Sequence, residues 1–489
     1  MKKCTMRRAL GDPKLLGTIL PGDSWLGWRA LLIASMGESL TDEERAAFAK
    51  LTGRPHEPGQ RVEELWVISG RRGGKSRSAA TLAVYLAALC DHTSRLSVGE
   101  KPVVLFLAQN QRQAAIAFGY CVGIFDAVPM LSRLVVNRTA DTLSLSNNVD
   151  LEVRPASFRS LRGVTAVGAI CDEVCYWRLD TSLNPDAEIL NAVRPALATT
   201  GGPLVVISSP YSKRGEVFNT YREHYGPSGD PAILVAKGAS RDFNPSLPQA
   251  TVDRALKRDH AKASAEYLGE FRTDLENFVD FETVQACVGE HLELPRGGFQ
   301  YRAFCDAAGG SGGDSFTLAI GHRESDDRVF IDAIRETRPP FSPMQVIDDY
   351  AALLKSYGIA RVSGDRFSGG FASEQFHRRG ISYQPTTMFK SDLYRDLLPL
   401  LNSGRIVLPR SDRLINQICS LERKIGRSGK DSISHPEREH DDVANAVAGV
   451  ANLLVGGQGG LSPHLVDRCF TDEVQPIFKD WEGPSQWLH

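Results

Sequence analysis

The chain has 489 residues, of which 42% are apolar and 24% are charged, and its formal net charge is −2. This length is too great for a single hydrophobic core and predicts two or three domains. The near-zero charge excludes a globally basic nucleic-acid-binding chain, so any such surface must be a local patch. No apolar run reaches the roughly 20 residues that cross a bilayer, so the sequence predicts no contact with a membrane.

The first part of the chain predicts strands that alternate with helices. Residues 1–60 form an N-terminal segment with a helix over Trp25–Met36. A strand over Leu65–Ile68 enters a Gly-rich loop, and a helix follows over Ser76–Cys90. Continuous apolar character predicts further buried strands at Val103–Ala108, Val167–Cys171 and Leu204–Ile207. This order predicts an α/β domain whose mostly parallel sheet is covered on both faces.

The Gly-rich loop matches a phosphate-binding loop. It consists of Gly70, Arg71, Arg72, Gly73, Gly74, Lys75 and Ser76. In the pattern G-x-x-x-x-G-K-[ST], backbone amides wrap the phosphates, the lysine reaches the terminal ones and the hydroxyl holds Mg²⁺. Ser69 stands where the first glycine of the pattern is expected. Because the loop follows a strand and opens a helix, the sequence predicts an ATP site.

Two acids complete the predicted ATP site. The strand that ends at Cys171 continues into Asp172 and Glu173, the order of a Walker B motif. Asp172 is expected to hold Mg²⁺, and Glu173 to polarise the attacking water. An acidic pair that caps a helix is the alternative interpretation. Of the two loop arginines, Arg71 is favoured as a cation that stabilises the γ-phosphate, while a solvent-facing arginine is the alternative.

Small hydroxyls follow the next predicted strand. Ser208 and Ser209 come after Leu204–Ile207 and precede Pro210. The carboxyl end of a central strand faces the nucleotide crevice in this architecture, so both serines are predicted to lie at the nucleotide and to sense the loss of phosphate. A turn-forming Ser-Pro is the alternative.

The rest of the chain predicts a second domain. A helical connector over residues 246–285 leads to three strands, Tyr301–Asp306, Phe316–Gly321 and Arg328–Ala333, which read as an antiparallel meander. An amphipathic helix, a short strand and a last apolar helix are then expected at Pro343–Tyr357, Ala360–Ser363 and Val443–Leu454. Residues 457–489, rich in glycine at their start, are predicted to be a flexible tail.

Acidic residues recur at the ends of these elements. Asp306 ends one strand, Asp365 follows another, and Asp441 and Asp442 open the last helix. Nucleases of the two-metal type need several carboxylates that converge on paired divalent cations. Two of these acids lie at strand ends and the third position lies at the start of a helix, all in one α/β segment. This layout predicts a ribonuclease H-like site, with Asp314 as an outer ligand. Surface aspartates and helix-capping aspartates are the alternative.

Basic residues and histidines surround the acids in sequence. The basic residues are Arg405, Arg410, Arg413, Arg423, Lys424, Arg427 and Lys430, to which Lys390 and Arg395 are added. They are predicted to contact the DNA backbone, with a solvated loop face as the alternative. His435 and His440 are weaker candidates for metal ligands. The sequence alone leaves open which of Asp441 and Asp442 points at the metals.

The ordered set of motifs resembles the large subunit of tailed-bacteriophage terminases, from about Trp28 to Leu454. The matching pieces are the Arg-bearing loop, Leu161-Arg162-Gly163 before Asp172-Glu173, Ser208-Ser209-Pro210, Tyr267–Phe271, Asp306 with Asp314, Asp365 and His440-Asp441-Asp442. The chain departs from the family at two positions. Ser69 replaces a glycine of the family pattern, and Asn445 stands where family members often have a further aspartate. The identity of a fourth metal ligand therefore stays open.

The resemblance implies a P-loop ATPase core of the additional-strand kind over residues 61–245 and a ribonuclease H-like nuclease over residues 286–456. ATP and Mg²⁺ are the implied cofactors, with Mn²⁺ as an alternative in the nuclease site. The implied partners are double-stranded DNA, a portal protein, a small terminase subunit and further copies in a pentameric ring. The implied location is the host cytoplasm, on the procapsid during packaging and not in the mature virion. A helicase or repair ATPase without nuclease activity is the alternative function.

Overall fold

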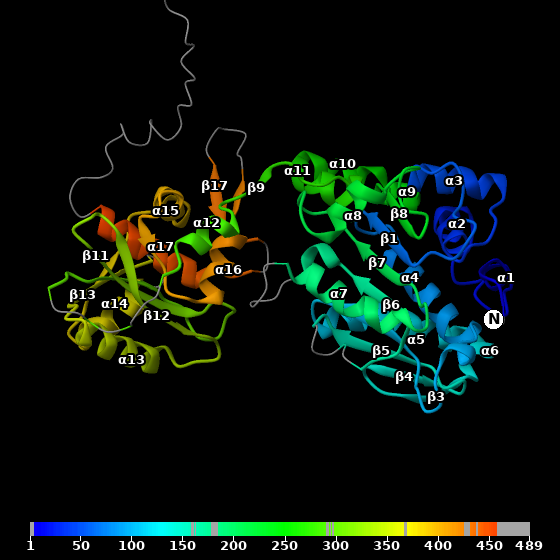
Figure 1. Cartoon of the computed structure of the whole chain (residues 1–489), viewed down its shortest axis with the longest axis horizontal. Helices are drawn as coiled ribbons and strands as arrows, with labels where there is room; N and C mark the ends of the chain where they lie inside the picture. Colours follow the sequence, from blue (N-terminus) through cyan, green and yellow to red (C-terminus); the bar gives the residue numbers. More distant parts are fainter. Residues whose placement is uncertain are drawn as a thin grey trace, which may run out of the picture. The chain divides into compact units, whose positions relative to one another are not determined.

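The computed structural model describes residues 4–157, 161, 163–177, 184–289, 293, 295, 298–365, 369–424, 431–436 and 439–456. The chain divides into two compact units, Met1–Glu276 and Asn277–His489, each with its own sheet (Figure 1). The division falls in the short strand β9 (Leu275–Asn277), inside the segment predicted as a connector. The predicted tail, together with Arg162, Arg427 and Lys430, lies outside the described residues.

In the described part of unit 1, eight strands form one sheet. In sheet order they are β3 (Val135–Arg138), β4 (Thr142–Leu145), β5 (Asp150–Pro155), β2 (Val103–Ala108), β6 (Ala166–Asp172), β7 (Leu204–Ser208), β1 (Glu64–Ser69) and β8 (Ile233–Gly238). All pairings from β5 to β8 are parallel, whereas β3 with β4 and β4 with β5 are antiparallel. The predicted parallel sheet is confirmed, and an antiparallel edge is added to it.

Both faces of this sheet are buried, which explains why its central strands are apolar throughout. Alternate residues of a strand point to opposite faces. Accordingly Leu65 and Val67 belong to one core, and Trp66 and Ile68 belong to the other. The helices that contribute to the first core are α1 (Met6–Gly11), α2 (Leu26–Ser35), α3 (Asp42–Thr52), α4 (Lys75–Val84), α5 (Gln111–Ala127), α6 (Pro129–Ser132) and α9 (Ser240–Phe243). Those of the second core are α7 (Pro185–Ala198) and α8 (Glu216–His224).

The strand order places the two predicted nucleotide motifs on non-adjacent strands. The loop follows β1, the acidic pair follows β6, and β7 pairs with both strands. This is the additional-strand arrangement that the resemblance implied. It brings the carboxyl end of β7, with Ser208 and Ser209, between the loop and the acids.

The polar segment after β8 is helical, as predicted. It contains α10 (Gln249–Arg258), α11 (His260–Ala263) and a π-helical turn, η6 (Ser264–Leu268). The turn ends at Gly269, whose φ of 71° is left-handed. This conformation favours glycine because it lacks a Cβ atom.

In unit 2, the described residues contain a six-stranded mixed sheet. Its order is β14 (Ser382–Pro385), β13 (Arg361–Gly364), β10 (Arg302–Asp306), β11 (Phe316–Arg323), β12 (Val329–Thr337) and β15 (Ile406–Val407). β10, β11 and β12 pair antiparallel, which confirms the predicted meander. β13 joins β10 in parallel, so the carboxyl ends of these two strands meet at the same edge.

Helices cover both faces of the second sheet. One core contains residues of α12 (Phe281–Ala286), α15 (Lys390–Asn402), α16 (Asp412–Ser420) and α17 (Asp442–Val455). The other contains residues of α13 (Pro343–Ser356) and α14 (Gly369–Arg378). Gly449 of α17 lies against the ring of Phe304 in β10, where a Cβ atom would clash. This close approach holds the start of α17 near the end of β10.

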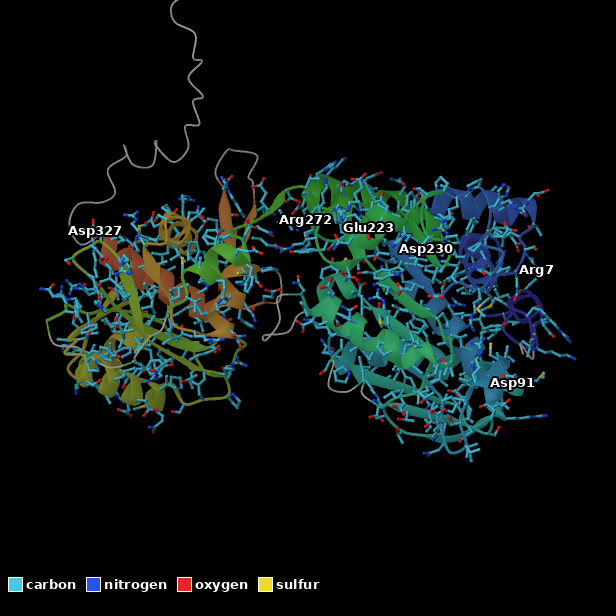
Figure 2. The ribbon with its side chains drawn as sticks, in the orientation of Figure 1. Arg7, Asp91, Glu223, Asp230, Arg272 and Asp327 are labelled. Atoms are coloured by element: carbon cyan, nitrogen blue, oxygen red, sulfur yellow. The ribbon has the colours of Figure 1, made fainter. Side chains whose placement is uncertain are left out.

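Charged side chains of both signs lie on the outside of each unit (Figure 2). Arg7 pairs with Glu44 at 2.6 Å, and Asp327 pairs with Arg323 at 2.6 Å. Within the described residues, no helix combines the length and the hydropathy that a membrane crossing requires.

Candidate functional site

The phosphate loop is held in place from two sides. Lys75, 7% exposed, donates through Nζ to the carbonyl oxygens of Ser69 at 2.9 Å and Gly70 at 3.3 Å. On the other side, Trp28 Nε1 donates to the Gly73 carbonyl at 2.7 Å. Gly74 adopts a φ of 90°, and a Cβ atom there would lie 2.8 Å from the ring of Trp25. A glycine is therefore required where the loop turns into α4. Ser76 follows in the first turn of that helix and is partly exposed.

The acids after β6 face this loop. Glu173 has a left-handed φ of 54°, and its backbone N–H donates to the Ile207 carbonyl at 2.7 Å. Its Oε1 lies 3.8 Å from Lys75 Nζ. Burial, and then the charge of Glu173, raises the pKa of Asp172 to about 7. A cation beside Asp172 would offset this cost, which is the environment expected of a Mg²⁺ ligand.

Ser209 connects the two motifs. Its hydroxyl accepts from Lys75 Nζ at 2.9 Å, and its backbone N–H donates to Glu173 Oε2 at 3.0 Å. Ser208 Oγ accepts from the Cys175 N–H at 3.1 Å. Both serines are buried. The structure thus brings together Lys75, Glu173 and Ser209, which the sequence predicted for one site and which follow three different strands.

The loop arginines make contacts that the sequence did not predict. Arg71 pairs with Glu266 of η6, with Nη1 3.2 Å from Oε1, and its backbone N–H donates to the Glu266 carbonyl at 2.5 Å. Arg72 has a left-handed φ of 63°, and its carbonyl accepts from Asn244 Nδ2 at 2.8 Å. Arg71 is therefore paired with the connector in this structure, and its role at the γ-phosphate stays a prediction.

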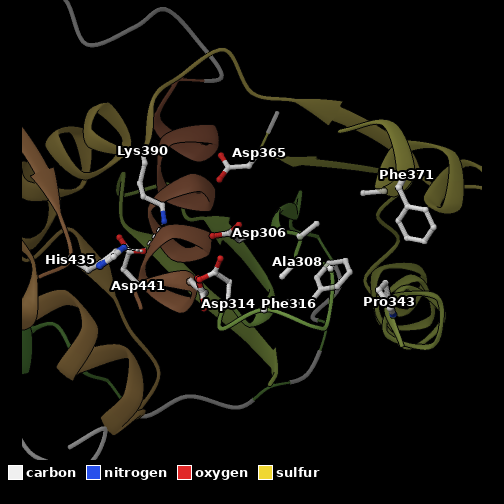
Figure 3. Close-up of a pocket in the computed structure, with 15 residues that line it drawn as sticks. Asp306, Ala308, Asp314, Phe316, Pro343, Asp365, Phe371, Lys390, His435 and Asp441 are labelled. Carbon is white, nitrogen blue, oxygen red and sulfur yellow. Dashed lines mark hydrogen bonds and ion pairs between the residues drawn. The ribbon is translucent and has the colours of Figure 1, made fainter. Parts of the chain in front are cut away.

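The predicted carboxylates of unit 2 meet in one cavity of about 720 Å³ (Figure 3). Asp306 reaches it from the end of β10, and Asp365 from the residue after β13. Asp442 opens α17, and Asp314 lies in the segment before β11. All four acids, together with Asp441, line this cavity. Residues far apart in the sequence are thus brought to one edge of the sheet.

Asn445 joins two of these acids. It is fully buried one turn into α17, and its Nδ2 donates to Asp306 Oδ2 at 2.7 Å and to Asp365 Oδ2 at 3.3 Å. Its Oδ1 is buried without a hydrogen-bond partner among the described residues. Asn445 lies three residues after Asp442, on the same face of the helix. That spacing was the available signal for an orienting role, which the sequence analysis did not assign.

The adjacent acids Asp441 and Asp442 differ in their partners. Asp441 is 1% exposed; its Oδ1 pairs with Lys390 Nζ at 2.7 Å, and its Oδ2 accepts from Tyr394 OH at 2.7 Å. Asp442 Oδ2 accepts one hydrogen bond, from the Ser315 N–H at 2.7 Å. Asp442 is therefore the better metal candidate. Lys390, which was predicted to contact the DNA backbone, is oriented by Asp441 in this structure.

Asp442 also belongs to a compact group of potential ligands. One atom each from Asp314, His440 and Asp442 lies within 4.8 Å of the other two. His440 Nδ1 is 3.0 Å from Asp314 Oδ1. The second histidine, His435, lines the same cavity, and its Nε2 is 3.9 Å from Asp441 Oδ1.

The donor set fits a hard divalent cation. Carboxylate oxygens are the preferred ligands of Mg²⁺ and Mn²⁺. Burial raises the pKa of Asp306 to about 7 and also raises that of Asp442. Burial lowers the pKa of Lys390, but Asp441 and Asp306 more than offset this, so its pKa is raised. A cation in the cavity would relieve the cost of holding these acids ionised.

Several of the basic residues that were predicted to contact DNA form ion pairs with acids of the same chain. Arg413 pairs with Glu336 at 3.0 Å, and Arg423 pairs with Asp431. Arg395 pairs with Asp392 at 2.6 Å. These three arginines are therefore paired with acids in the structure, and their contact with the DNA backbone stays a prediction. The sequence could not show the pairing of Arg413, because Glu336 lies 77 residues away along the chain.

Comparisons with known proteins give matches among solved structures only. No protein-family model matches the sequence, and neither does any curated protein. The large terminase of bacteriophage HK97 is 15% identical with a TM-score of 0.37, covering 84% of this chain and 94% of that one. The large terminase of a thermophilic bacteriophage, in complex with ADP, is 14% identical with a TM-score of 0.36, covering 81% and 95%. The magnesium-bound nuclease of the large terminase from the thermophilic phage G20c is 18% identical with a TM-score of 0.30, covering 35% and 95%.

At these TM-scores the likeness does not assign a function. The chemistry of the two sites therefore rests on the side chains that each unit brings together.

Proposed function

We propose that the chain is the large subunit of a tailed-bacteriophage terminase, which hydrolyses ATP to drive double-stranded DNA into a procapsid and cuts concatemeric DNA. One observation carries this proposal. Asp306, Asp365 and Asp442 line one cavity in unit 2, while Lys75 and Glu173 face one another in unit 1. A phosphate-binding loop and a carboxylate cluster in separate units supply the two activities that packaging requires.

In the motor, the loop amides and Lys75 bind the phosphates of ATP. Ser76 and Asp172 would hold Mg²⁺, which neutralises the developing phosphate charge when bound. Glu173 orients the attacking water and accepts its proton. Ser209, which contacts both Lys75 and Glu173, is placed to register the departure of the γ-phosphate.

In the nuclease, Asp306, Asp365 and Asp442 would hold divalent cations, with Asp314 and His440 as further ligands. The cations polarise the scissile phosphate and activate a water when bound. Asn445 orients two of the carboxylates. Lys390, fixed by Asp441, presents a cation to the phosphate. Asp441 therefore has an orienting role in this proposal and is not a ligand.

The partners and the location follow from the proposed family. They are double-stranded DNA, a portal protein, a small terminase subunit and further copies of this chain in a pentameric ring. The work would take place in the host cytoplasm on the procapsid. The helicase alternative needs a second motor domain. The antiparallel meander and carboxylate cavity of unit 2 favour the nuclease instead.

Separation of the two activities tests the proposal. Lys75→Ala should abolish ATP hydrolysis and leave plasmid cutting in Mn²⁺ within about twofold, since the sites lie in separate units. Asp365→Ala should abolish cutting and leave ATP hydrolysis unchanged. The controls are Lys257→Ala and Asp349→Ala, which remove exposed charges outside both sites. If the wild type does not cut plasmid, the helicase alternative is favoured.

The assignment of the water-orienting acid has its own test. Glu173→Ala should retain binding of ATP and lose hydrolysis by about 10²-fold or more, because a positioned proton acceptor contributes on that scale. Turnover within a few fold of the wild type would show that Glu173 is not this acid. Glu223→Gln, an exposed position on α8, is the control.

A further inference from the structure

The nuclease cavity has two chemically different sides. One side, here called the charged side, carries the carboxylates together with Lys390 and His435. The other, here called the apolar side, is formed by Ala307, Ala308, Phe316, Pro343, Phe371 and Ala372. In Figure 3, Lys390 and His435 lie on one side of Asp306, and Phe371 and Pro343 lie on the opposite side. Cation binding and phosphate chemistry use only the charged side.

Phe371 is the exposed aromatic residue of the apolar side. Its side chain is 50% exposed, whereas Phe316, which lines the same cavity, is 1% exposed. It lies near the start of α14, while Phe376 of the same helix is fully buried in the core. The core therefore does not need Phe371, although an exposed phenyl ring is unfavourable in water. A ligand that covers the ring would remove this cost.

The neighbouring chemistry indicates what that ligand is. A phosphodiester bound through cations at Asp306 and Asp365 would bring its own sugar and base into the same cavity. In an intact duplex the faces of the bases are stacked on one another, so no base face is available to an aromatic side chain. A base that has left the stack offers a flat apolar face, which aromatic side chains bind without sequence preference. The volume of about 720 Å³ lies in the range of pockets that enclose small organic ligands.

We propose that the apolar side is a nucleobase subsite, in which Phe371 stacks on a base that has left the helix beside the scissile phosphate. The inference rests on the proposed nuclease function and adds a substrate property to it. The enzyme cuts DNA whose strands are locally unpaired faster than it cuts the same sequence fully paired. In an unpaired substrate the base is already unstacked, so the free energy of unstacking does not oppose its binding to Phe371.

Cutting of three matched DNAs by the full chain in Mn²⁺ tests the subsite. All three DNAs share one sequence. The first is fully paired, and the second is unpaired over a short central bubble. The third has the same bubble and an abasic nucleotide beside the mapped cut. The wild type should cut the bubble at least about tenfold faster than the duplex. Phe371→Ala should slow bubble cutting by roughly 5- to 150-fold, the scale of one base–aromatic stack. Phe371→Trp should keep most of the rate.

The abasic DNA identifies the contact. It should slow the wild type by as much as Phe371→Ala does on the bubble, and it should slow Phe371→Ala no further. The matched control is Phe281→Ala, which removes a 43% exposed phenylalanine of α12 outside the cavity and should change no rate.

Two results would overturn the subsite while leaving the nuclease intact. These are equal cutting of duplex and bubble by the wild type, and bubble cutting by Phe371→Ala within about threefold of the wild type. If the wild type cuts none of the three DNAs in Mn²⁺, the nuclease proposal itself fails, and the subsite fails with it.

Discussion

Asn445 shows how one uncharged residue can organise a charged site. Asp306 and Asp365 repel each other, and a shared donor between them fixes the positions of their oxygens. An aspartate at this position would add charge to a cluster in which burial already raises the pKa of Asp306 to about 7. The amide therefore orients the two carboxylates at a smaller electrostatic cost than a third acid would.

Removal of this amide should impair cutting and leave the motor intact. Asn445→Ala leaves two carboxylates without their donor, and loss of such an orienting contact typically costs about 10- to 100-fold in metal affinity or activity. Asn452→Ala is the control, since Asn452 lies on the same helix and donates to Asp396 at 2.7 Å, outside the cavity. Mn²⁺ titration of plasmid cutting measures the effect. Equal losses in both variants would indicate damage to the helix instead.

The raised pKa of Asp306 makes the stability of the metal-free protein depend on pH. The ordinary value of 3.8 applies in the unfolded chain, and the folded value is about 7. The protonated form therefore stabilises the fold fully below pH 3.8, and this stabilisation is lost as the pH rises through about 7. At pH 8 and in the presence of a chelator, the metal-free Asp306→Asn variant should have a higher melting temperature than the metal-free wild type. This difference in melting temperature should become smaller as the pH falls to 5.

Thermal melts with and without Mn²⁺ measure this effect. Saturating Mn²⁺ should stabilise the wild type and not the variant, because the cation binds the carboxylate and neutralises it. Asp349→Asn, which changes an exposed acid on α13, should show no such dependence on pH. If Asp306→Asn is less stable than the wild type at pH 8 in the presence of chelator, an ionised and buried Asp306 does not destabilise the metal-free fold.

Residue roles were only partly predictable from the sequence. The acids could be located because each ends a strand or opens a helix. The difference between Asp441 and Asp442 could not, because it depends on Lys390 and Tyr394 of α15, about 50 residues away in the sequence. Arg71 was predicted to contact phosphate, and in the structure it pairs with Glu266, which the folded connector supplies.

At the scale of elements, the phosphate loop and the turn η6 are packed against each other. A Cβ atom on Gly70 would lie 2.7 Å from the Glu266 carbonyl oxygen and would also contact Ser240 Oγ. The Arg71 backbone N–H donates to the same carbonyl. The connector therefore contributes to the shape of the loop.

A methyl group at this contact should disturb the nucleotide site. Gly70→Ala overpacks the junction, which typically costs about 1–3 kcal/mol. If the loop absorbs that cost, ATP-analogue affinity should fall by roughly 5- to 150-fold. Gly119→Ala in α5 is the control, since its Cβ would meet open space and should be neutral or stabilising by about 0.5–1 kcal/mol. Calorimetric titration with the ATP analogue measures the affinity of both variants. Unchanged affinity in Gly70→Ala would show that the loop is not constrained by η6.

Elements with long apolar runs were predicted well, and short ones were missed. β1, β2, β6 and β7 lie where the sequence placed them because strands buried on both faces are apolar throughout. β3 is largely exposed and β15 has only two residues, so neither carries a periodic signal. The antiparallel edge formed by β3 and β4 was not predicted, because β3 is largely exposed and the alternation of β4 extends over only four residues.

At the scale of the whole molecule, the chain consists of two units with separate cores and separate chemistry. The structural division at Glu276 lies before the predicted nuclease boundary at residue 286. Phe278, Val279 and Val284 fall between these points, and all three are buried in the core of unit 2. The segment that the sequence assigned to a connector thus contributes to the second core.

This difference predicts how fragments behave. A fragment of residues 277–456 should fold and cut DNA in Mn²⁺ without ATP hydrolysis. A fragment that starts at residue 286 loses three buried apolar side chains, each worth about 1.5–3 kcal/mol. That loss is comparable to the total stability of a domain, about 5–15 kcal/mol, so the shorter fragment should be unfolded or aggregated. Circular dichroism and thermal melts compare the two, and equal stability would place the boundary at residue 286.

The central claim is that carboxylates distant in sequence form one divalent-cation site, separate from a nucleotide site at Lys75. The most direct measurement is anomalous diffraction from crystals of the full chain soaked with Mn²⁺ and a non-hydrolysable ATP analogue. The account predicts manganese peaks among Asp306, Asp365 and Asp442, and the analogue's phosphates within hydrogen-bonding distance of Lys75. Manganese found only beside the nucleotide, with no peak among the three aspartates, would contradict it.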